Sequence, residues 1–116
     1  MAVVACISDL FFQSKVVETA RHLHVDLAIA GSESKLDEVI RENAESAFIV
    51  DLCFGNAQGI DVVKRIRREL PEAELVAFAP HVEEDLLEAA RQAGATDVMS
   101  RAKFTKRLSE ILTRGR

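Results

Sequence analysis

The chain has 116 residues, a length that predicts one domain spanning residues 1–116 rather than two. With 48% hydrophobic and 29% charged residues it is typical of a soluble globular protein, and a domain of this size can fold without a disulfide or a metal ion. The absence of Trp and Tyr argues against a stacking platform for single-stranded nucleic acid.

The net charge of −4 is unevenly distributed along the chain. Residues 101–116 carry six Lys and Arg and one acid, whereas residues 1–100 carry nine basic and eighteen acidic residues. A basic C-terminal segment could contact nucleic acid, but no helix-turn-helix or zinc-finger pattern accompanies it. We therefore expect a protein partner with an acidic surface, and no nucleic acid.

The N-terminal segment MAVVACISDLFF is apolar, but it lacks a basic start and reaches Asp9 too early for a signal peptide. No apolar run approaches the roughly 20 residues of a membrane-spanning helix. Cys6 and Cys53 both lie in strand-like runs, which predicts buried thiols rather than a disulfide. These features predict a cytoplasmic protein that contacts no membrane.

Short, β-branched, apolar runs alternate along the chain with segments in which apolar residues recur every three or four positions. The first pattern predicts buried strands and the second predicts helices. The predicted strands are 2–8, 25–30, 47–51, 74–79 and 96–100. The predicted helices lie within 11–23, 32–45, 60–70, 82–93 and 104–112, with Pro71 ending the third helix and Gly94 capping the fourth.

Five strands that alternate with five helices through short connections require a parallel sheet covered by helices on both faces. In such α/β sheets, ligands bind in the crevice beyond the C-terminal ends of the strands. Ser8 and Asp9 follow the first strand, and Asp51 ends the third. We therefore expect these three side chains to reach the crevice.

Asp9 and Asp51 would converge if the first and third strands are neighbours. Two close carboxylates repel each other unless a cation or a proton lies between them. Magnesium suits such a pair, and a carboxylate beside the metal could act as a nucleophile toward a phosphoryl group. The alternative is structural: Asp51 caps a loop and Asp9 caps the first helix.

Two motifs resemble those of response-regulator receiver domains. VDLCFGNAQGIDVVKRIRREL (50–70) is similar to the family's aspartate, loop, glycine and helix signature, and EEDLLEAARQAGATDVMSR (83–101) resembles its Ala-x-x-x-Gly-Ala-x-Asp signature. The resemblance covers nearly the whole chain. It implies a flavodoxin-like, CheY-like (βα)5 three-layer sandwich with strand order 2-1-3-4-5. It also implies that Asp51 is at the position that accepts a phosphoryl group from a partner histidine kinase.

The resemblance further implies a magnesium site, in which Asp9 and Asp51 are ligands and Cys53 contributes its backbone carbonyl. The family has two acids after its first strand, whereas this chain has Ser8 and Asp9, so one acid is missing. We therefore expect magnesium to bind weakly or not at all near neutral pH. Arg101, if it reaches Asp51, would compete with the metal for the carboxylate.

The chain also departs from the family at the residues that carry its switch. Ala79 stands where the fourth strand should end in Thr or Ser, and Val98 stands where the fifth strand should carry an aromatic residue. Arg101-Ala102 replaces the family's Lys-Pro. A ligand shifts a conformational equilibrium only through contacts that differ between the two states. We therefore expect that phosphorylation of Asp51 would not drive the usual switch.

Taken together, these residues predict an atypical receiver-like signalling module that acts by protein–protein docking and is not an enzyme. One alternative is a working phospho-accepting single-domain response regulator that tolerates the exchanged residues. A second alternative is a small α/β ligand-binding or enzymatic domain, although no nucleophile–base set is evident in the sequence.

The expected docking surface is the face formed by the fourth predicted helix, the fifth strand and the final helix. One strip of this face is acidic and the other is basic, and such strips can complement each other in a two-fold homodimer. The acidic strip comprises Glu83, Glu84, Asp85 and Glu88; the basic strip comprises Arg101, Lys103, Lys106 and Arg107. Any homodimer should be weak and salt-sensitive, and the alternative is that both strips are only solvated.

Overall fold

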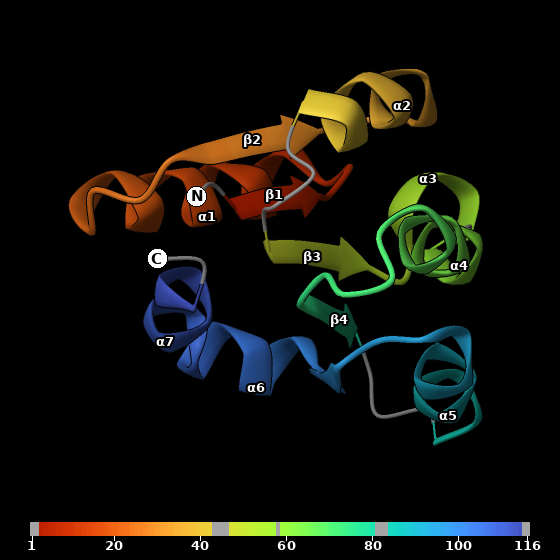
Figure 1. The fold of residues 1–116 in the computed structure, drawn as a ribbon. Helices are drawn as coiled ribbons and strands as arrows, with labels where there is room; N and C mark the ends of the chain where they lie inside the picture. Colours follow the sequence, from red (N-terminus) through yellow and green to blue (C-terminus); the bar gives the residue numbers. More distant parts are fainter. Residues whose placement is uncertain (1–2, 43–46, 58, 81–83, 115–116) are drawn as a thin grey trace.

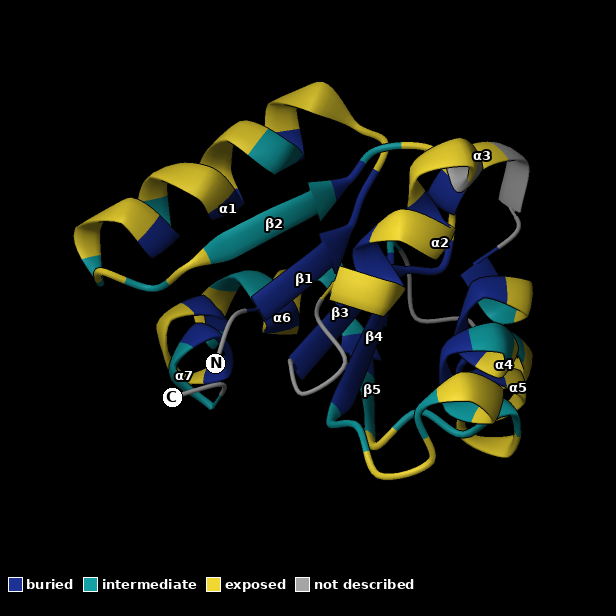
Figure 2. Cartoon of the chain, turned by 45° about the horizontal axis from the view of Figure 1, so that its top comes forward, coloured by how far each residue is buried: buried dark blue, intermediate teal, exposed yellow. Residues whose placement is uncertain are grey.

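A computed structural model describes residues 3–42, 47–57, 59–80 and 84–114 of the chain. Its five strands form one parallel sheet in the order β2-β1-β3-β4-β5, as the resemblance implies. The strands are β1 (Val3–Cys6), β2 (Leu27–Ala30), β3 (Ala47–Asp51), β4 (Leu75–Ala79) and β5 (Asp97–Ser100). The three central strands β1, β3 and β4 are fully buried, and the edge strands are partly exposed (Figure 2).

The described helices cover both faces of this sheet, so that the architecture has three layers (Figure 1). One face is covered by α1 (Leu10–His22), α6 (Arg101–Lys106) and α7 (Leu108–Thr113), and the other by α2 (Glu33–Glu42), α4 (Gly59–Glu69) and α5 (Glu84–Ala93). A short helix, α3 (Phe54–Ala57), lies in the connection between β3 and α4. Within the described residues, none of the helices has the length and apolar character needed to cross a bilayer.

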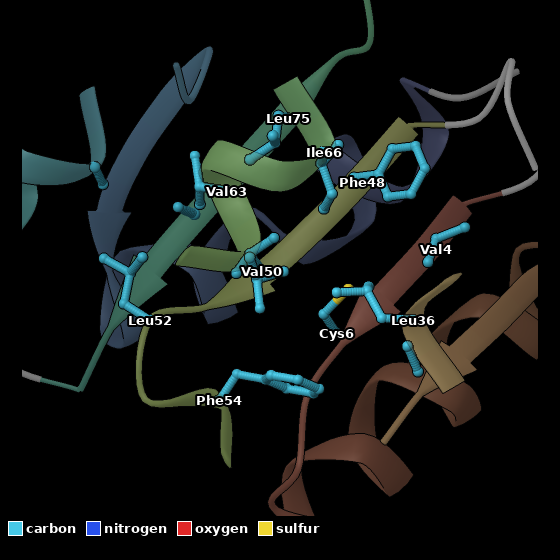
Figure 3. Packing of buried hydrophobic residues seen from close by; sticks show 14 of the residues in the cluster. Val4, Cys6, Leu36, Phe48, Val50, Leu52, Phe54, Val63, Ile66 and Leu75 are labelled. Carbon is cyan, nitrogen blue, oxygen red and sulfur yellow. The ribbon is translucent and has the colours of Figure 1, made fainter. Parts of the chain in front are cut away.

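Alternation along the strands divides the buried residues into two clusters, because successive side chains of a strand point to opposite faces. The first core lies against α2, α4 and α5 and includes Phe48, Val50 and Leu75 (Figure 3). The second core lies against α1, α6 and α7 and includes Ile49 and Phe78. Asp51 comes two residues after Ile49, and this alternation directs its side chain to the side of the second core.

Two glycines explain how the chain turns at the ends of elements. A Cβ atom on Gly59 would lie 2.3 Å from the Cα atom of Leu52, so the first residue of α4 packs directly against the turn that follows Asp51. Gly94 has a φ of 116°, a conformation that favours glycine, and it directly follows α5 as predicted.

The prediction of one continuous final helix is wrong. The structure has two short helices, α6 and α7, which meet at Arg107, where the backbone leaves the helical range with φ −102° and ψ 11°. The apolar spacing of residues 104–112 continues across this break, because every buried member still faces the second core. In this geometry the Arg107 side chain lies 3.6 Å from Asp97 and 3.2 Å from Glu110.

Other differences concern the ends of elements. β2 begins two residues later than predicted, β4 and β5 begin one residue later, and β3 has the predicted bounds. Residue 2, the predicted start of the first strand, lies outside the described residues. The first strand ends at Cys6 rather than at Ser8. Parts of the predicted helices 32–45 and 82–93 lie outside the described residues, at 43–45 and 82–83. The short helix α3 was not predicted; its anchor is Phe54, which is fully buried in the first core.

Candidate functional site

Charged side chains gather beyond the C-terminal ends of the central strands. Asp9 lies three residues after β1, Asp51 is the last residue of β3, and Arg101 directly follows β5 as the first residue of α6. The parallel registers, in which Cys6 pairs with Val50 and Asp51 with Phe78, bring these strand ends to the same edge of the sheet. Both acids therefore lie at the edge of the sheet where the sequence predicts the crevice.

Asp51 is buried, with 2% of its surface exposed. Its Oδ1 atom accepts a hydrogen bond of 2.9 Å from the backbone N–H of Cys53, and its Oδ2 atom lies 3.5 Å from a terminal nitrogen of Arg101. Burial raises the pKa of the Asp51 carboxyl, the backbone hydrogen bond from Cys53 and the charge of Arg101 lower it, and the nearby Asp9 carboxylate raises it; the net direction is upward. Asp51 is thus a carboxylate for which ionisation is costly.

Asp9 is more exposed than Asp51 and has a structural task in addition to its place in the crevice. Its Oδ1 atom accepts hydrogen bonds of 3.0 Å and 3.3 Å from the backbone N–H groups of Phe11 and Phe12, so it is the N-cap of α1. Its Oδ2 atom lies 3.8 Å from the other terminal nitrogen of Arg101. The structural alternative for Asp9, that it caps the first helix, is confirmed, and the same carboxylate also faces the crevice.

Arg101 connects the two acids and lies beside two neighbouring aromatic rings. The central carbon of its guanidinium lies 4.8 Å from the ring centroid of Phe12 and 5.9 Å from that of Phe78, within the range of cation–π interactions. Phe104 stacks on Phe78, with ring centroids 4.4 Å apart. The Nε atom of Arg101 is buried and has no hydrogen-bond partner within the described residues.

The rings around Arg101 were predicted only as parts of a helix stripe or a strand. Phe12 is the third residue of α1, and Phe78 on β4 is the register partner of Asp51 on β3. Two signals in the sequence could have identified them: Phe12 lies three residues after the capping Asp9, and Phe78 is the penultimate residue of a strand that ends at the crevice. Neither signal shows that the rings would lie beside a guanidinium.

The remaining predicted site residues lie nearby but differ in their surroundings. Ser8 is exposed, and its hydroxyl oxygen accepts a hydrogen bond of 3.3 Å from the backbone N–H of Gly55. Ala79 is fully buried in the first core, and Val98 packs against the same core. Cys53 was predicted as buried, but it is exposed, because β3 ends at Asp51 and Cys53 lies in the turn that follows.

The carboxylate oxygens in the crevice do not fit a magnesium ion in this arrangement. Each acid uses one oxygen for backbone N–H groups and directs the other to Arg101. Within the described residues, no three His, Cys, Asp or Glu side chains form a group that could hold a metal ion. Magnesium loses its hydration water reluctantly, so it needs oxygens that are not already occupied by a fixed cation.

Solved structures of response regulators have the same fold as this chain. A response regulator from Thermotoga maritima superposes with a TM-score of 0.78 at 19% identity, covering 97% of each chain. The receiver domain of NtrX from Brucella abortus superposes with a TM-score of 0.83 at 16% identity, covering 97% of this chain and 95% of that one. A response regulator from Burkholderia pseudomallei, solved with a phosphorylated aspartic acid, a calcium ion and citrate, has a TM-score of 0.72 at 14% identity, over 97% and 71% of the chains.

The chain therefore has the flavodoxin-like, CheY-like fold of response-regulator receiver domains. No protein-family model matches it. In sequence it is similar to the transcriptional activator protein ExaE from Pseudomonas putida, with 29% identity over 73 residues. This match covers 63% of the chain and 34% of ExaE.

Proposed function

We propose that this chain is a receiver-like signalling module of two-component systems, located in the cytoplasm, which acts by docking to a protein partner. The receiver-domain fold supports a role in two-component signalling. The observation that carries the docking mode is the state of Asp51, the residue at the phosphoacceptor position. Its carboxylate is buried and faces Arg101, so it is poorly prepared to react with a phosphoryl donor.

The switch positions support the same proposal. Ala79 packs into the first core and Val98 packs against it. As alanine and valine, they have neither a hydroxyl group to bind a phosphoryl group at Asp51 nor an aromatic ring to move in response to it. Because a ligand shifts an equilibrium only through differential contacts, modification of Asp51 would have little influence on the shape of the module. The module then presents its partner with one conformation.

The proposed docking face consists of α5, β5 and α6, and its partner is a histidine kinase or another signalling protein. Fewer charges are available on this face than the sequence suggests, because Arg101 faces the crevice acids, Arg107 pairs with Asp97 and Glu110, and Glu88 pairs with Arg91. Glu83 lies outside the described residues. The exposed charges that remain are Glu84 and Asp85 on α5 and Lys103 and Lys106 on α6.

Two acids and two lysines on one face could still pair with a second copy of the chain across a two-fold axis. Exposed ion pairs contribute about 0–1 kcal/mol each, so such a homodimer would be weak. We expect sedimentation at low salt to show self-association that decreases at high salt and is lost in Lys103→Glu/Lys106→Glu. A monomer under all these conditions would leave docking to other proteins as the only use of this face.

The proposal is tested by titrating the uniformly ¹⁵N-labelled protein with magnesium and beryllofluoride, which imitates a phosphoryl group on an aspartate. We expect no saturable chemical-shift changes in α5, β5 and α6, because the switch positions lack the groups that respond. Asp51→Asn serves as the control, since it cannot bind beryllofluoride at this position.

Saturable shifts on that face in the wild-type protein, absent in Asp51→Asn, would overturn the proposal and favour the working phosphoacceptor. A second measurement addresses docking directly. Any kinase or signalling protein captured by the module should bind wild type and Asp51→Asn with equal affinity, whereas Lys103→Glu/Lys106→Glu should bind more weakly. Binding that depends on Asp51 but not on the lysines would contradict the docking mode.

A further inference from the structure

The guanidinium of Arg101 lies where a cation must lie to relieve the repulsion between the two crevice acids. One terminal nitrogen is 3.5 Å from Oδ2 of Asp51, and the other is 3.8 Å from Oδ2 of Asp9. A single side chain therefore bridges the two carboxylates through separate atoms. No other Lys or Arg of the described residues forms an ion pair with either acid.

We propose that Arg101 is the resident cation of the crevice: it takes the place of a divalent metal ion between Asp9 and Asp51 and keeps the site closed to metals. The inference rests on the proposed receiver-like role only in the choice of this crevice. One residue of the chain thereby performs the neutralising task for which the resembled family uses a metal. The module would thus have a metal-independent site.

Several contacts keep Arg101 in this position. The rings of Phe12 and Phe78, whose centroids are 5.3 Å apart, both lie beside its guanidinium, and Phe104 packs against both rings from the second core. Its backbone is fixed as the first residue of α6, where the Ser100 hydroxyl accepts a hydrogen bond of 3.2 Å from the N–H of Lys103. Arg101 is thus held through its backbone, through the rings beside its guanidinium and through the two carboxylates at its terminal nitrogens.

Movement of Arg101 into solvent would be unfavourable although its side chain is 32% exposed. Asp51 would remain buried beside Asp9 without a counter-charge, and a buried carboxylate must then take up a proton or find another cation. The two rings would also lose their cation. In the absence of any ligand, these costs favour the arrangement in which Arg101 bridges the two acids, which we call the closed arrangement.

The closed arrangement excludes a divalent ion for two reasons. The two oxygens that would coordinate it are those that face the guanidinium, and the positive charge of Arg101 repels a second cation at the same place. Removal of the guanidinium would leave the two Oδ2 atoms of Asp9 and Asp51 without a cation. We therefore expect that loss of Arg101 creates a metal site rather than only weakening the fold.

The test uses Mn²⁺ as a probe and follows paramagnetic broadening of backbone amide signals by NMR. In the wild-type protein we expect no selective broadening at residues 8–9 and 51–53. Broadening should occur only at exposed acids such as Glu84 and Asp85. In Arg101→Gln we expect selective broadening at residues 8–9 and 51–53, with affinity for Mn²⁺ at least tenfold higher than in wild type. Magnesium should reverse it, and Asp51→Asn in the Arg101→Gln background should abolish it.

Arg101→Gln removes the charge and leaves a shorter polar side chain. Arg101→Lys is a second variant that retains the charge on a single nitrogen, which cannot bridge the two carboxylates through separate atoms, so Mn²⁺ binding should lie between that of wild type and that of Arg101→Gln. Arg107→Gln is the matched control, because it removes an ion-paired arginine from the same segment but away from the crevice. Equal Mn²⁺ binding by wild type and Arg101→Gln, whether strong or absent, would overturn the inference. That result would leave the docking proposal intact, because docking is judged from the beryllofluoride and partner-binding measurements.

Discussion

Two arginines lie near opposite ends of the last two strands, and their surroundings differ. Arg101 follows β5 at the C-terminal end of the sheet, whereas Arg114 lies near the residues that begin β4 and β5. Arg114 donates hydrogen bonds of 3.2 Å to Glu74, 3.3 Å to Asp97 and 3.0 Å to Glu110. Each of its acidic partners is at least one-third exposed.

The contacts of Arg101 are of another kind. They are longer than ordinary hydrogen bonds, at 3.5 Å and 3.8 Å, one of its carboxylate partners is buried, and its Nε atom has no partner within the described residues. Arg114 thus links the end of α7 to the sheet through hydrogen bonds to partly exposed acids. Arg101 instead offsets the unfavourable charge of the buried Asp51. Unfavourable arrangements of this kind are typical of sites that serve function rather than stability.

The largest expected effect is that of Arg101→Ala. It leaves the buried Asp51 without its cation, so we expect the free energy of unfolding at pH 7 to fall by about 3 kcal/mol. Urea denaturation measures this change. The control is Lys103→Ala, an exposed position on the same helix that should change stability by less than about 0.5 kcal/mol. Addition of Asp51→Asn to Arg101→Ala should restore part of the loss, and failure to do so would mean that Asp51 is not the cause.

The next effect is that of Phe12→Leu, which removes one of the two rings against Arg101. We expect a loss of about 1–2 kcal/mol, from reduced burial and from the lost cation–π contact. A double-mutant cycle with Arg101→Ala separates the two terms. The coupling between the two residues should be about 0.5–1 kcal/mol, and a coupling of zero would show that the ring only fills space.

Asp51→Asn should increase stability modestly at neutral pH, because burial raises the pKa of Asp51. With a raised pKa the folded state binds a proton more tightly than the unfolded chain. The stability of the wild type therefore falls as the pH rises from the unfolded pKa of about 3.9 through the folded pKa, and stays level above it. The advantage of Asp51→Asn should accordingly shrink as the pH is lowered through this window. Thermal unfolding at several pH values checks this, and a wild type more stable than the variant at pH 7 would contradict it.

The smallest effect is expected at the other end of the sheet. Arg114→Gln should cost about 0.5–1 kcal/mol, because its partners are exposed enough to be solvated when the arginine is lost. This cost should decrease at high salt, since surface ion pairs are screened. Urea denaturation of wild type and variant at low and high salt provides the comparison. A loss as large as that for Arg101→Ala would remove the distinction between the two arginines.

The order of elements could be predicted from the sequence because it depends on local patterns. Short, apolar, β-branched runs such as residues 47–51 are typical of buried strands, and their alternation with helices through short connections favours a parallel sheet. Asp51 could be assigned to the crevice for the same reason, since the end of a buried parallel strand always lies at the ligand-binding edge. The residue type alone predicted that Gly94 ends α5, because glycine readily adopts the positive φ observed there.

What surrounds Asp51 was decided by the tertiary structure. Phe12, Phe78 and Arg101 belong to three elements separated by many residues, and only the register and the packing of α1 and α6 on one face bring them together. The break at Arg107 and the exposure of Cys53 have the same origin, because apolar spacing reports which face of an element is buried and not where the backbone turns. A local pattern can therefore identify the acid at the crevice, but only the three-dimensional arrangement of distant residues selects the cation beside it.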